Sequence, residues 1–288
     1  MKISRTVACD CVYGILYAVS LIPMPVLYAL SSFACFLACR MGGYRRHVVI
    51  QNIARSFPDK KYEEVRVIAS RFYGCFAAYF AEIVKSISAP AGSIEAKVAF
   101  ENLEIIDAHV KGGRNVIACL GHCGNWEMLN ILPVKLSHGV YAVYRPLKAG
   151  IADELMVRLR SRFGATLIPD KSVVRHILSG KTPLSVYLFL ADQCPRIRED
   201  KYRFVFLNQQ AYLFSGMEKL ARRTDSAVVY LHITQVAKGS YRVRCMPLCT
   251  EAGATREGLI TQKYVSLLTE NITEQPCGWL WTHRRWKK

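Results

Sequence analysis

An uncharged stretch near the N-terminus is the feature that most limits how this chain can fold. No Asp, Glu, Lys or Arg occurs over the 29 positions of residues 11–39. A helix of about 20 residues spans the hydrocarbon core of a bilayer, so the length suffices for one span. Pro23 and Pro25 interrupt the stretch, however, and each removes a helical hydrogen bond. We therefore predict two apolar helices, roughly 11–22 and 26–39, with a break at the prolines.

Two half-helices of this kind would lie in the membrane interface or form a shallow hairpin, and a helical hairpin buried in a soluble core is the alternative. Basic residues follow directly at Arg40, Arg45 and Arg46, and basic residues that flank an apolar segment favour the cytoplasmic side. The apolar region is too long for a secretory signal peptide and lacks a clear cleavage site. We predict a membrane-associating segment over residues 1–43 and one further domain over residues 44–288.

The charge of the chain indicates an anionic partner. Lys and Arg number 39 against 22 Asp and Glu, and the surplus of +17 is dispersed along the chain. Such a surface suits phospholipid headgroups, a phosphorylated lipid, an acidic carrier protein or nucleic acid, although a merely soluble basic surface is also common. Nucleic acid is the poorest match, because no binding motif is recognisable and the uncharged stretch is out of place in such a protein.

Alternation of helical and strand patterns begins at about residue 100 and predicts an α/β fold, in which helices flank a mixed sheet. Short apolar runs predict strands at 116–120, 140–144, 184–190, 227–234 and 241–246. Three- and four-residue periodicity predicts helices at 62–86, 103–110, 151–163, 215–223 and 256–274.

The stretch from Gly121 to Met128 carries the clearest chemical signal. His122 and Glu127 come directly after the apolar strand 116–120, and catalytic groups are commonly placed at strand ends in α/β sheets. On one regular helix five residues advance about 500°, so the pair would not share a face, whereas a loop around Gly124 would let it meet. An imidazole oriented by a carboxylate takes a proton from a hydroxyl. A plain hydrogen-bonding pair is the alternative interpretation.

Cysteine usage predicts a reducing compartment and no metal site. The 11 cysteines are an odd number, are scattered through apolar stretches, and form no Cys-x-x-Cys pair. Cys119, His122 and Cys123 are potential metal ligands, but no second pair is spaced to complete a zinc site. We interpret these cysteines as small packing residues.

Several blocks of the sequence agree in order with those of one enzyme family. They are the N-terminal apolar segment, Tyr44–Arg46, Asn52–Pro58, His122 with Glu127 in a His-x-x-x-x-Glu pattern, Tyr144–Leu147, Arg158–Gly164, Ala191–Gln193 and Trp279–Lys287. With these blocks the whole chain resembles the bacterial late-acting lipid A acyltransferases, the lauroyl/myristoyl acyltransferase family of the lysophospholipid acyltransferase superfamily. The loop Ala211–Ser215 departs from the threonine-rich pattern that usually precedes the family's equivalent of Gly216, which concerns acyl binding and the acceptor more than the reaction class.

The resemblance implies transfer of a fatty acyl group from an acyl-carrier thioester to a hydroxyl of a lipid A precursor. His122 would be the general base, and Glu127 would orient its ring. Donors to the developing oxyanion, or ligands for substrate phosphate, would come from Asn125, Arg145, Arg160 or a backbone N–H near Gly124. Structural pairing is the alternative for the two arginines.

Two further blocks have less definite roles. Asp192 and Gln193 end a predicted strand and would shape the same cleft, or simply form a strand-end turn. The block Trp279–Trp286 would dock at lipid headgroups, or pack at the C-terminus.

The implied partners are acyl carrier protein as donor, a membrane lipid as acceptor and an anionic membrane surface, with no nucleic acid. Coenzyme A remains open as an alternative donor. No cofactor or metal is expected, because a thioester already activates the acyl carbon. The implied location is the cytoplasmic face of the bacterial inner membrane. The alternatives are an acyltransferase for a lysophospholipid or an amino-acid lipid, and a non-catalytic lipid-binding protein of the same fold.

Overall fold

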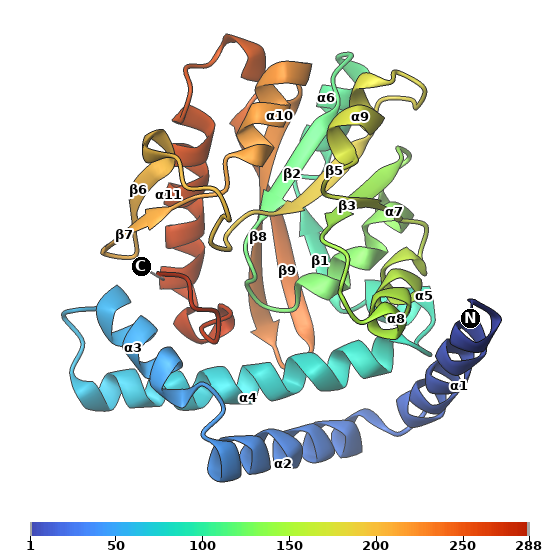
Figure 1. The fold of residues 1–288 in the computed structure, drawn as a ribbon, viewed down its shortest axis with the longest axis vertical. Helices are drawn as coiled ribbons and strands as arrows, with labels where there is room; N and C mark the ends of the chain where they lie inside the picture. The colour runs from blue at the N-terminus through green and yellow to red at the C-terminus, as the bar shows by residue number, and fades with distance from the viewer. Residues whose placement is uncertain (1, 287–288) are drawn as a thin grey trace.

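A mixed seven-stranded sheet forms the centre of the computed structural model within residues 2–286, the part of the chain that the structure describes (Figure 1). Its strand order is β1-β9-β8-β2-β5-β3-β4. The strands β8 and β9 run antiparallel, and the other neighbouring pairs are parallel. The bounds are β1 Val98–Glu101, β2 Val116–Leu120, β3 Val140–Tyr144, β4 Thr166–Pro169, β5 Val186–Leu190, β8 Ala227–Ala237 and β9 Ser240–Cys249, with a separate hairpin of β6 Arg203–Phe206 and β7 Gln209–Tyr212. The predicted α/β fold with a mixed sheet is confirmed.

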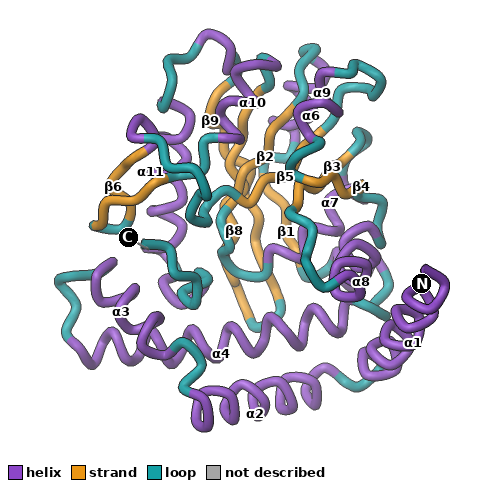
Figure 2. The backbone as a smooth tube through the Cα atoms, viewed as in Figure 1, coloured by secondary structure: helices purple, strands orange, loops and turns teal. Residues whose placement is uncertain are grey.

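Helices cover both faces of this sheet (Figure 2). They are α1 Lys2–Ser20, α2 Met24–Gly42, α3 Arg46–Ser56, α4 Tyr62–Ser86, α5 Ala91–Glu95, α6 Glu104–Lys111, α7 Leu132–Lys135, α8 Gly150–Ser161, α9 Val173–Leu178, α10 Gly216–Thr224 and α11 Leu259–Glu274. The five predicted helices correspond to α4, α6, α8, α10 and α11. A 3₁₀ segment, η1 (Trp126–Ile131), follows the loop after β2.

The central strand β2 shows why the sheet is buried on both sides. All five of its residues are buried, and successive side chains of a strand point to opposite faces. Ile117 and Cys119 join the core formed with α3, α4, α9, α10 and α11. Val116, Ala118 and Leu120 join the core formed with α5, α6, η1 and α7. A continuous apolar run is what a parallel strand between two helical layers requires.

The N-terminal helices form the bent apolar pair that the prolines predict. The helix α1 ends at Ser20, α2 begins at Met24, and the pair bends by 115° at the break. Pro25 occupies the first turn of α2, where a missing N–H costs nothing. The Lys85 ammonium of α4 donates to the carbonyl oxygens of Ser20 and Ile22 at 3.0 and 3.1 Å, which fixes the break against the rest of the protein.

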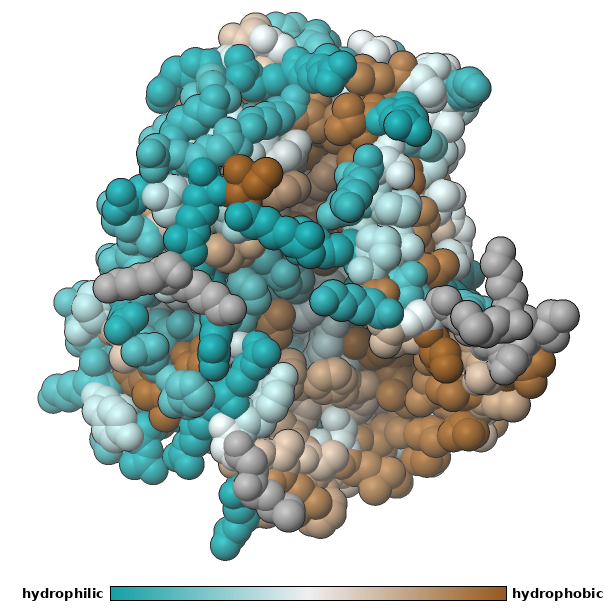
Figure 3. Space-filling model, in the orientation of Figure 1, coloured by the Kyte–Doolittle hydropathy of each residue, from teal (hydrophilic) through white to brown (hydrophobic). Residues whose placement is uncertain are grey.

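The outer side of this helix pair is apolar and exposed rather than buried in a soluble core. Between residues 7 and 40 the buried side chains are Cys9, Ser20 and Leu27. Figure 3 shows hydrophobic side chains gathered on the part of the surface where Figure 1 places α1 and α2. Among the residues described, α4 alone is long and apolar enough to cross a membrane as one helix, and α1 with α2 meets the same criterion only as a bent pair. The inner side of α4 packs in the core.

Candidate active site

Two neighbouring parallel strands bring His122 and Asp192 together. The register pairs Leu120 of β2 with Leu190 of β5, so each of the two polar residues lies two positions beyond its strand. The carboxyl ends of parallel strands meet at one edge of a sheet, where ligands bind in open α/β folds. A side chain at Gly121 would clash with Leu268 Cδ1, 2.3 Å from the position of its Cβ, so glycine lets Leu268 of α11 pack against this turn.

Asp192 holds the imidazole ring of His122. The ring Nδ1 lies 2.5 Å from Asp192 Oδ1, and the backbone N–H of His122 donates to Oδ2 at 2.9 Å. The indole Nε1–H of Trp279 donates to the same Oδ2 at 2.7 Å. Burial would by itself raise the pKa of Asp192, but attraction by the His122 ring and these hydrogen bonds outweigh it, and the pKa of Asp192 lies well below its usual range. Asp192 is therefore a carboxylate with the correct charge to stabilise an imidazolium.

The opposite ring nitrogen of His122 is the one that can act as a base. With Nδ1–H donated to Asp192, the neutral ring carries its lone pair on Nε2, an assignment that rests on the hydrogen-bond network. The side-chain amide nitrogen of Gln193 lies 3.3 Å from Nε2 and can donate to it. The Trp126 ring approaches edge-on with its centroid 4.7 Å away. His122 is 8% exposed, so the ring is largely shielded from water.

Glu127 binds Arg160 rather than His122. Arg160 Nε donates to Glu127 Oε2 at 2.8 Å and Nη2 donates to Oε1 at 2.5 Å, a two-pronged ion pair between η1 and α8. Burial disfavours the charged guanidinium, but the hydrogen bonds and attraction from Glu127 outweigh this, and the pKa of Arg160 is raised. Within residues 2–286 no hydrogen bond joins Glu127 to His122, so the ring partner expected from the five-residue spacing is replaced by Asp192. The reason is that η1 carries Glu127 toward α8, while β5 supplies a carboxylate beside the ring.

Both members of this ion pair line a narrow cavity. The cavity has a volume of about 60 Å³ and lies between the ends of β2, β3 and β5 and the segments η1 and α8. Its other walls are mostly apolar, with Leu120, Trp126 and Leu190 among them. Trp126 lines this cavity together with Arg160 and also contacts the His122 ring, so it is the residue that links the cavity to the imidazole.

Asn125 has a positioning role in the structure. Its side-chain oxygen accepts from the backbone N–H of Glu127 at 3.2 Å, which caps η1, and its amide donates to Glu82 Oε2 at 2.8 Å. The Glu82 carboxyl group of α4 is 1% exposed and also accepts from the hydroxyls of Tyr241 at 2.8 Å and Tyr28 at 3.0 Å. The three- and four-residue periodicity predicts that Glu82 lies on an apolar helix. It does not indicate these three hydrogen bonds, because the partners of Glu82 are distant in sequence.

Arg145 lies outside this cluster. It follows β3 at the same edge of the sheet, its side chain is 54% exposed, and its Nε pairs with Asp170 at 3.4 Å. An exposed ion pair of this kind contributes little to stability, so Arg145 remains available at the surface.

The C-terminal block packs against the His122 loop. Leu280 N–H donates to the His122 carbonyl at 3.1 Å, and Gly124 N–H donates to the Gly278 carbonyl at 2.9 Å. Trp279 and Arg285 are 2% and 1% exposed, so neither lies at headgroup level. Of the two interpretations of this block, the structure therefore supports packing for these two residues. Trp279 was not assigned to the site from sequence, and its bond to Asp192 places it there.

The cysteines near His122 are packed in the core. Cys119 and Cys123 are buried, and burial raises the pKa of each thiol above its usual range. In the part of the chain that the structure describes, no three His, Cys, Asp or Glu side chains form a group that could hold a metal ion.

We expect strong chelators to leave turnover unchanged, and the variant Cys123→Ala to keep at least about half of the activity, because a buried neutral thiol acts as a small apolar group. Turnover measured with and without EDTA checks this. Loss of activity that added zinc restores would contradict it.

We also expect Glu82→Leu to lower both stability and activity. The leucine side chain leaves the Asn125 amide and the hydroxyls of Tyr28 and Tyr241 without their buried acceptor, and an unsatisfied buried polar group costs about 1–3 kcal/mol. The catalytic rate constant should fall because Asn125 loses its anchor. Tyr28→Phe is the matched control, since it removes one bond to Glu82 and leaves that of Asn125. Equal effects of the two variants on kcat, with equal thermal unfolding shifts, would argue against a link through Asn125.

One comparison with known proteins identifies a family. The sequence model of the family described as "Bacterial lipid A biosynthesis acyltransferase" matches residues 2–288. No curated protein matches the chain.

Proposed function

We propose that this protein transfers a fatty acyl group from an acyl-carrier-protein thioester to a hydroxyl of a lipid A precursor. The chain belongs to the bacterial lipid A biosynthesis acyltransferase family and is therefore an acyltransferase. The observation that carries the proposal is the buried pair of Asp192 and His122 at the ends of two parallel strands, with the exposed Gln193 beside the ring Nε2. It supports a base with a fixed tautomer, whose Nε2 the acceptor hydroxyl would approach in place of the Gln193 amide.

His122 Nε2 removes the proton of the acceptor hydroxyl while the oxygen attacks the thioester carbonyl carbon. Throughout the reaction Asp192 accepts a hydrogen bond from the Nδ1–H group, and its charge stabilises the imidazolium that forms. The attack converts the carbonyl oxygen into an oxyanion. Collapse of this intermediate breaks the carbon–sulfur bond, and the imidazolium returns its proton to the departing thiolate. The products are the acylated lipid and the free carrier thiol.

Arg160 is our candidate for stabilising the oxyanion. Its pair with Glu127 uses the Nε and Nη2 groups, which leaves N–H donors of the guanidinium unused in that pair. The ion pair with Glu127 holds the Arg160 guanidinium in a fixed position. A donor that is already in position can stabilise the oxyanion without moving during the reaction. In this proposal Asp192, and not Glu127, orients the base.

The charge of the chain supports both proposed partners. Acyl carrier protein and a phosphorylated glycolipid are anionic, and a protein of net charge +17 attracts them. Arg145, exposed at the sheet edge beyond β3, is our candidate for binding a substrate phosphate outside the His122 cluster.

We propose that the protein lies on the cytoplasmic face of the bacterial inner membrane, with the outer sides of α1 and α2 in the lipid. The support is the exposed apolar face of the two helices and the break between them, on which Ile15, Leu21, Leu30 and Phe33 are 52–65% exposed.

Replacing Leu30 and Phe33 together by serine should move a large share of the protein from the membrane pellet to the supernatant. Both side chains point away from the core, so the fold should be kept. The control is Val205→Ser with Ile197→Ser, a pair at least as exposed but outside the N-terminal helices. If both double variants sediment like the native protein, the proposed attachment through α1 and α2 is wrong.

The reaction is tested with purified protein and defined substrates. The donor is acyl-carrier-protein thioester or acyl-coenzyme A, the acceptor is a lipid A precursor or a lysophospholipid, and the products are weighed by mass spectrometry. Acylation of the lipid A precursor from the carrier thioester supports the proposal. Acylation of the lysophospholipid alone would move the assignment to that acceptor, and binding of lipid without turnover would indicate a non-catalytic protein.

A further inference from the structure

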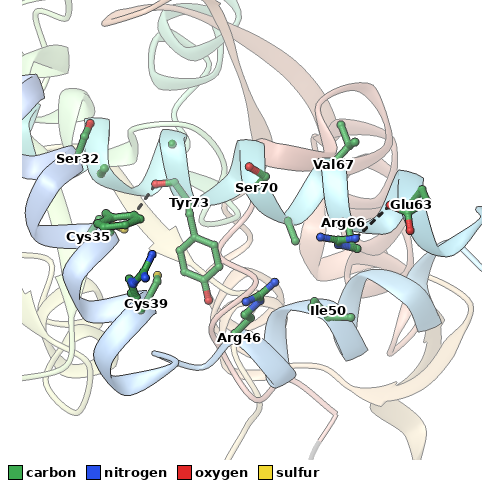
Figure 4. A pocket seen from close by; sticks show the side chains of 15 residues that line it. Ser32, Cys35, Cys39, Arg46, Ile50, Glu63, Arg66, Val67, Ser70 and Tyr73 are labelled. Carbon is green, nitrogen blue, oxygen red and sulfur yellow. Dashed lines mark hydrogen bonds and ion pairs between the residues drawn. The ribbon is translucent and has the colours of Figure 1, made fainter.

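A groove lies between α2, α3 and α4, apart from the His122 site. Its volume is about 710 Å³, within the usual range for small-molecule sites. Figure 4 shows that the labelled side chains come from all three helices, with Cys35 and Cys39 from α2, Arg46 from α3, and Arg66 and Tyr73 from α4. None of its lining residues belongs to the arrangement proposed for catalysis.

The groove carries positive charge that the protein does not neutralise. Arg40, Arg46 and Arg66 line it, against the single acid Glu63. Glu63 pairs with Arg66 at 3.3 Å. Arg40 lies over the ring of Phe36, with its guanidinium carbon 5.9 Å from the ring centroid. In the part of the chain that the structure describes, no carboxylate lies within 4.0 Å of Arg40 or Arg46, so two guanidinium groups are left to bind an external anion.

The walls between these charges are apolar and continue into the exposed side of α2. Ile50, Val67 and Ala77 line the groove. Phe36 both lines the groove and is 54% exposed, and Phe33 is 61% exposed on the same helix. A ligand with an anionic end and an apolar end therefore finds both kinds of surface in one place, in the order in which a phospholipid presents them.

We propose that this groove binds the headgroup of an anionic phospholipid. Arg40 and Arg46 would hold the phosphodiester, for which the planar guanidinium is better suited than an ammonium group. The acyl chains would lie along Phe36 and the outer side of α2. The bound lipid is a structural ligand that is not acylated, so the proposal does not depend on the reaction proposed above.

The test uses the full-length protein in a nonionic detergent, titrated calorimetrically with three probes. They are dihexanoyl phosphatidylglycerol, dihexanoyl phosphatidylcholine and glycerol 3-phosphate. Phosphatidylglycerol should saturate at one molecule per chain, and phosphatidylcholine should bind at least about 10-fold more weakly because its headgroup has no net charge. Glycerol 3-phosphate should also bind weakly, because it lacks the chains that contact Phe36.

The variant Arg40→Gln/Arg46→Gln should bind phosphatidylglycerol at least about 10-fold more weakly, the scale expected for losing hydrogen bonds to a charged group. The control Arg55→Gln/Arg223→Gln removes the same charge at exposed positions outside the groove and should keep the affinity. The four arginines are exposed, and thermal unfolding confirms that each variant is folded.

Three results would overturn the proposal. Equal binding of the two phospholipids would show that the phosphate charge is not recognised. An equal loss of affinity in the control variant would show that overall charge, and not the groove, determines binding. Binding of glycerol 3-phosphate as tight as that of phosphatidylglycerol would assign the groove to a free phosphate ester instead of a lipid.

Discussion

Replacement of His122 by alanine is expected to lower the rate of acyl transfer at least about 100-fold, the usual scale for the loss of a positioned acid–base group. A lipid hydroxyl is a poor nucleophile at neutral pH, and His122 Nε2 is the nitrogen that the Asp192 bond leaves free to take its proton. The alanine variant should keep its affinity for the acyl donor, because the imidazole acts in the transition state. The loss should therefore appear in kcat rather than in KM.

The matched control for this variant is His47→Ala, which removes an exposed imidazole on α3. It should retain normal turnover. Thermal unfolding of both variants separates catalytic loss from unfolding. A folded His122→Ala variant that transfers acyl groups at a near-normal rate would rule out His122 as the base.

The partner of His122 shows where inference from the sequence was sufficient and where it was not. The apolar run before Gly121 placed the histidine at the end of a strand, and the structure has it there. The five-residue spacing and the His-x-x-x-x-Glu pattern indicate Glu127 as its partner. Asp192 is 70 residues away and reaches the ring because β2 and β5 are neighbours in register, which no local pattern encodes. The sequence does predict that Asp192 lies at the end of a strand, and this position is the one signal in the sequence that it could reach the His122 ring.

Other features were missed for similar physical reasons. The hairpin β6–β7 turns at Leu207 and Asn208 with φ of 48° and 61°. Tight hairpin turns of this kind are usually recognised by glycine, which is absent here. The strand β4 has four residues and ends in Pro169, so its run of apolar residues is too short to be recognised as a strand from the sequence. The break between α1 and α2 was predicted correctly because proline acts locally.

Substitution of Asp192 by asparagine is the second large expected effect, a loss in kcat of about 100-fold to 10,000-fold. The amide is similar in shape but cannot stabilise an imidazolium by charge. It also carries two N–H groups where the carboxylate accepts from His122 Nδ1, His122 N and Trp279 Nε1. The ring would then favour the other tautomer, with the proton on Nε2, and the base would be blocked.

Stability should change with pH in a direction that the pKa of Asp192 determines. Because this pKa is depressed in the folded protein, the carboxylate contributes stability above its unfolded pKa near 3.8, and that contribution is lost as the pH falls through the folded pKa. The difference in free energy of unfolding between the native protein and Asp192→Asn should thus be fully present above about pH 4 and should shrink as the pH falls below that value. A difference that is constant with pH would mean that the charge of Asp192 is not what stabilises the fold.

The variant Glu127→Gln distinguishes the role of Glu127 from that of Asp192. It should also lose activity, since Glu127 positions the Arg160 guanidinium, but it should leave the imidazole untouched. Nitrogen NMR of labelled histidine distinguishes the cases, because the tautomer of His122 determines the shifts of its two ring nitrogens. We expect the signals to change in Asp192→Asn and to stay unchanged in Glu127→Gln. The reverse result would return the orienting role to Glu127, and would require η1 to turn its carboxylate from Arg160 toward His122 when substrate binds.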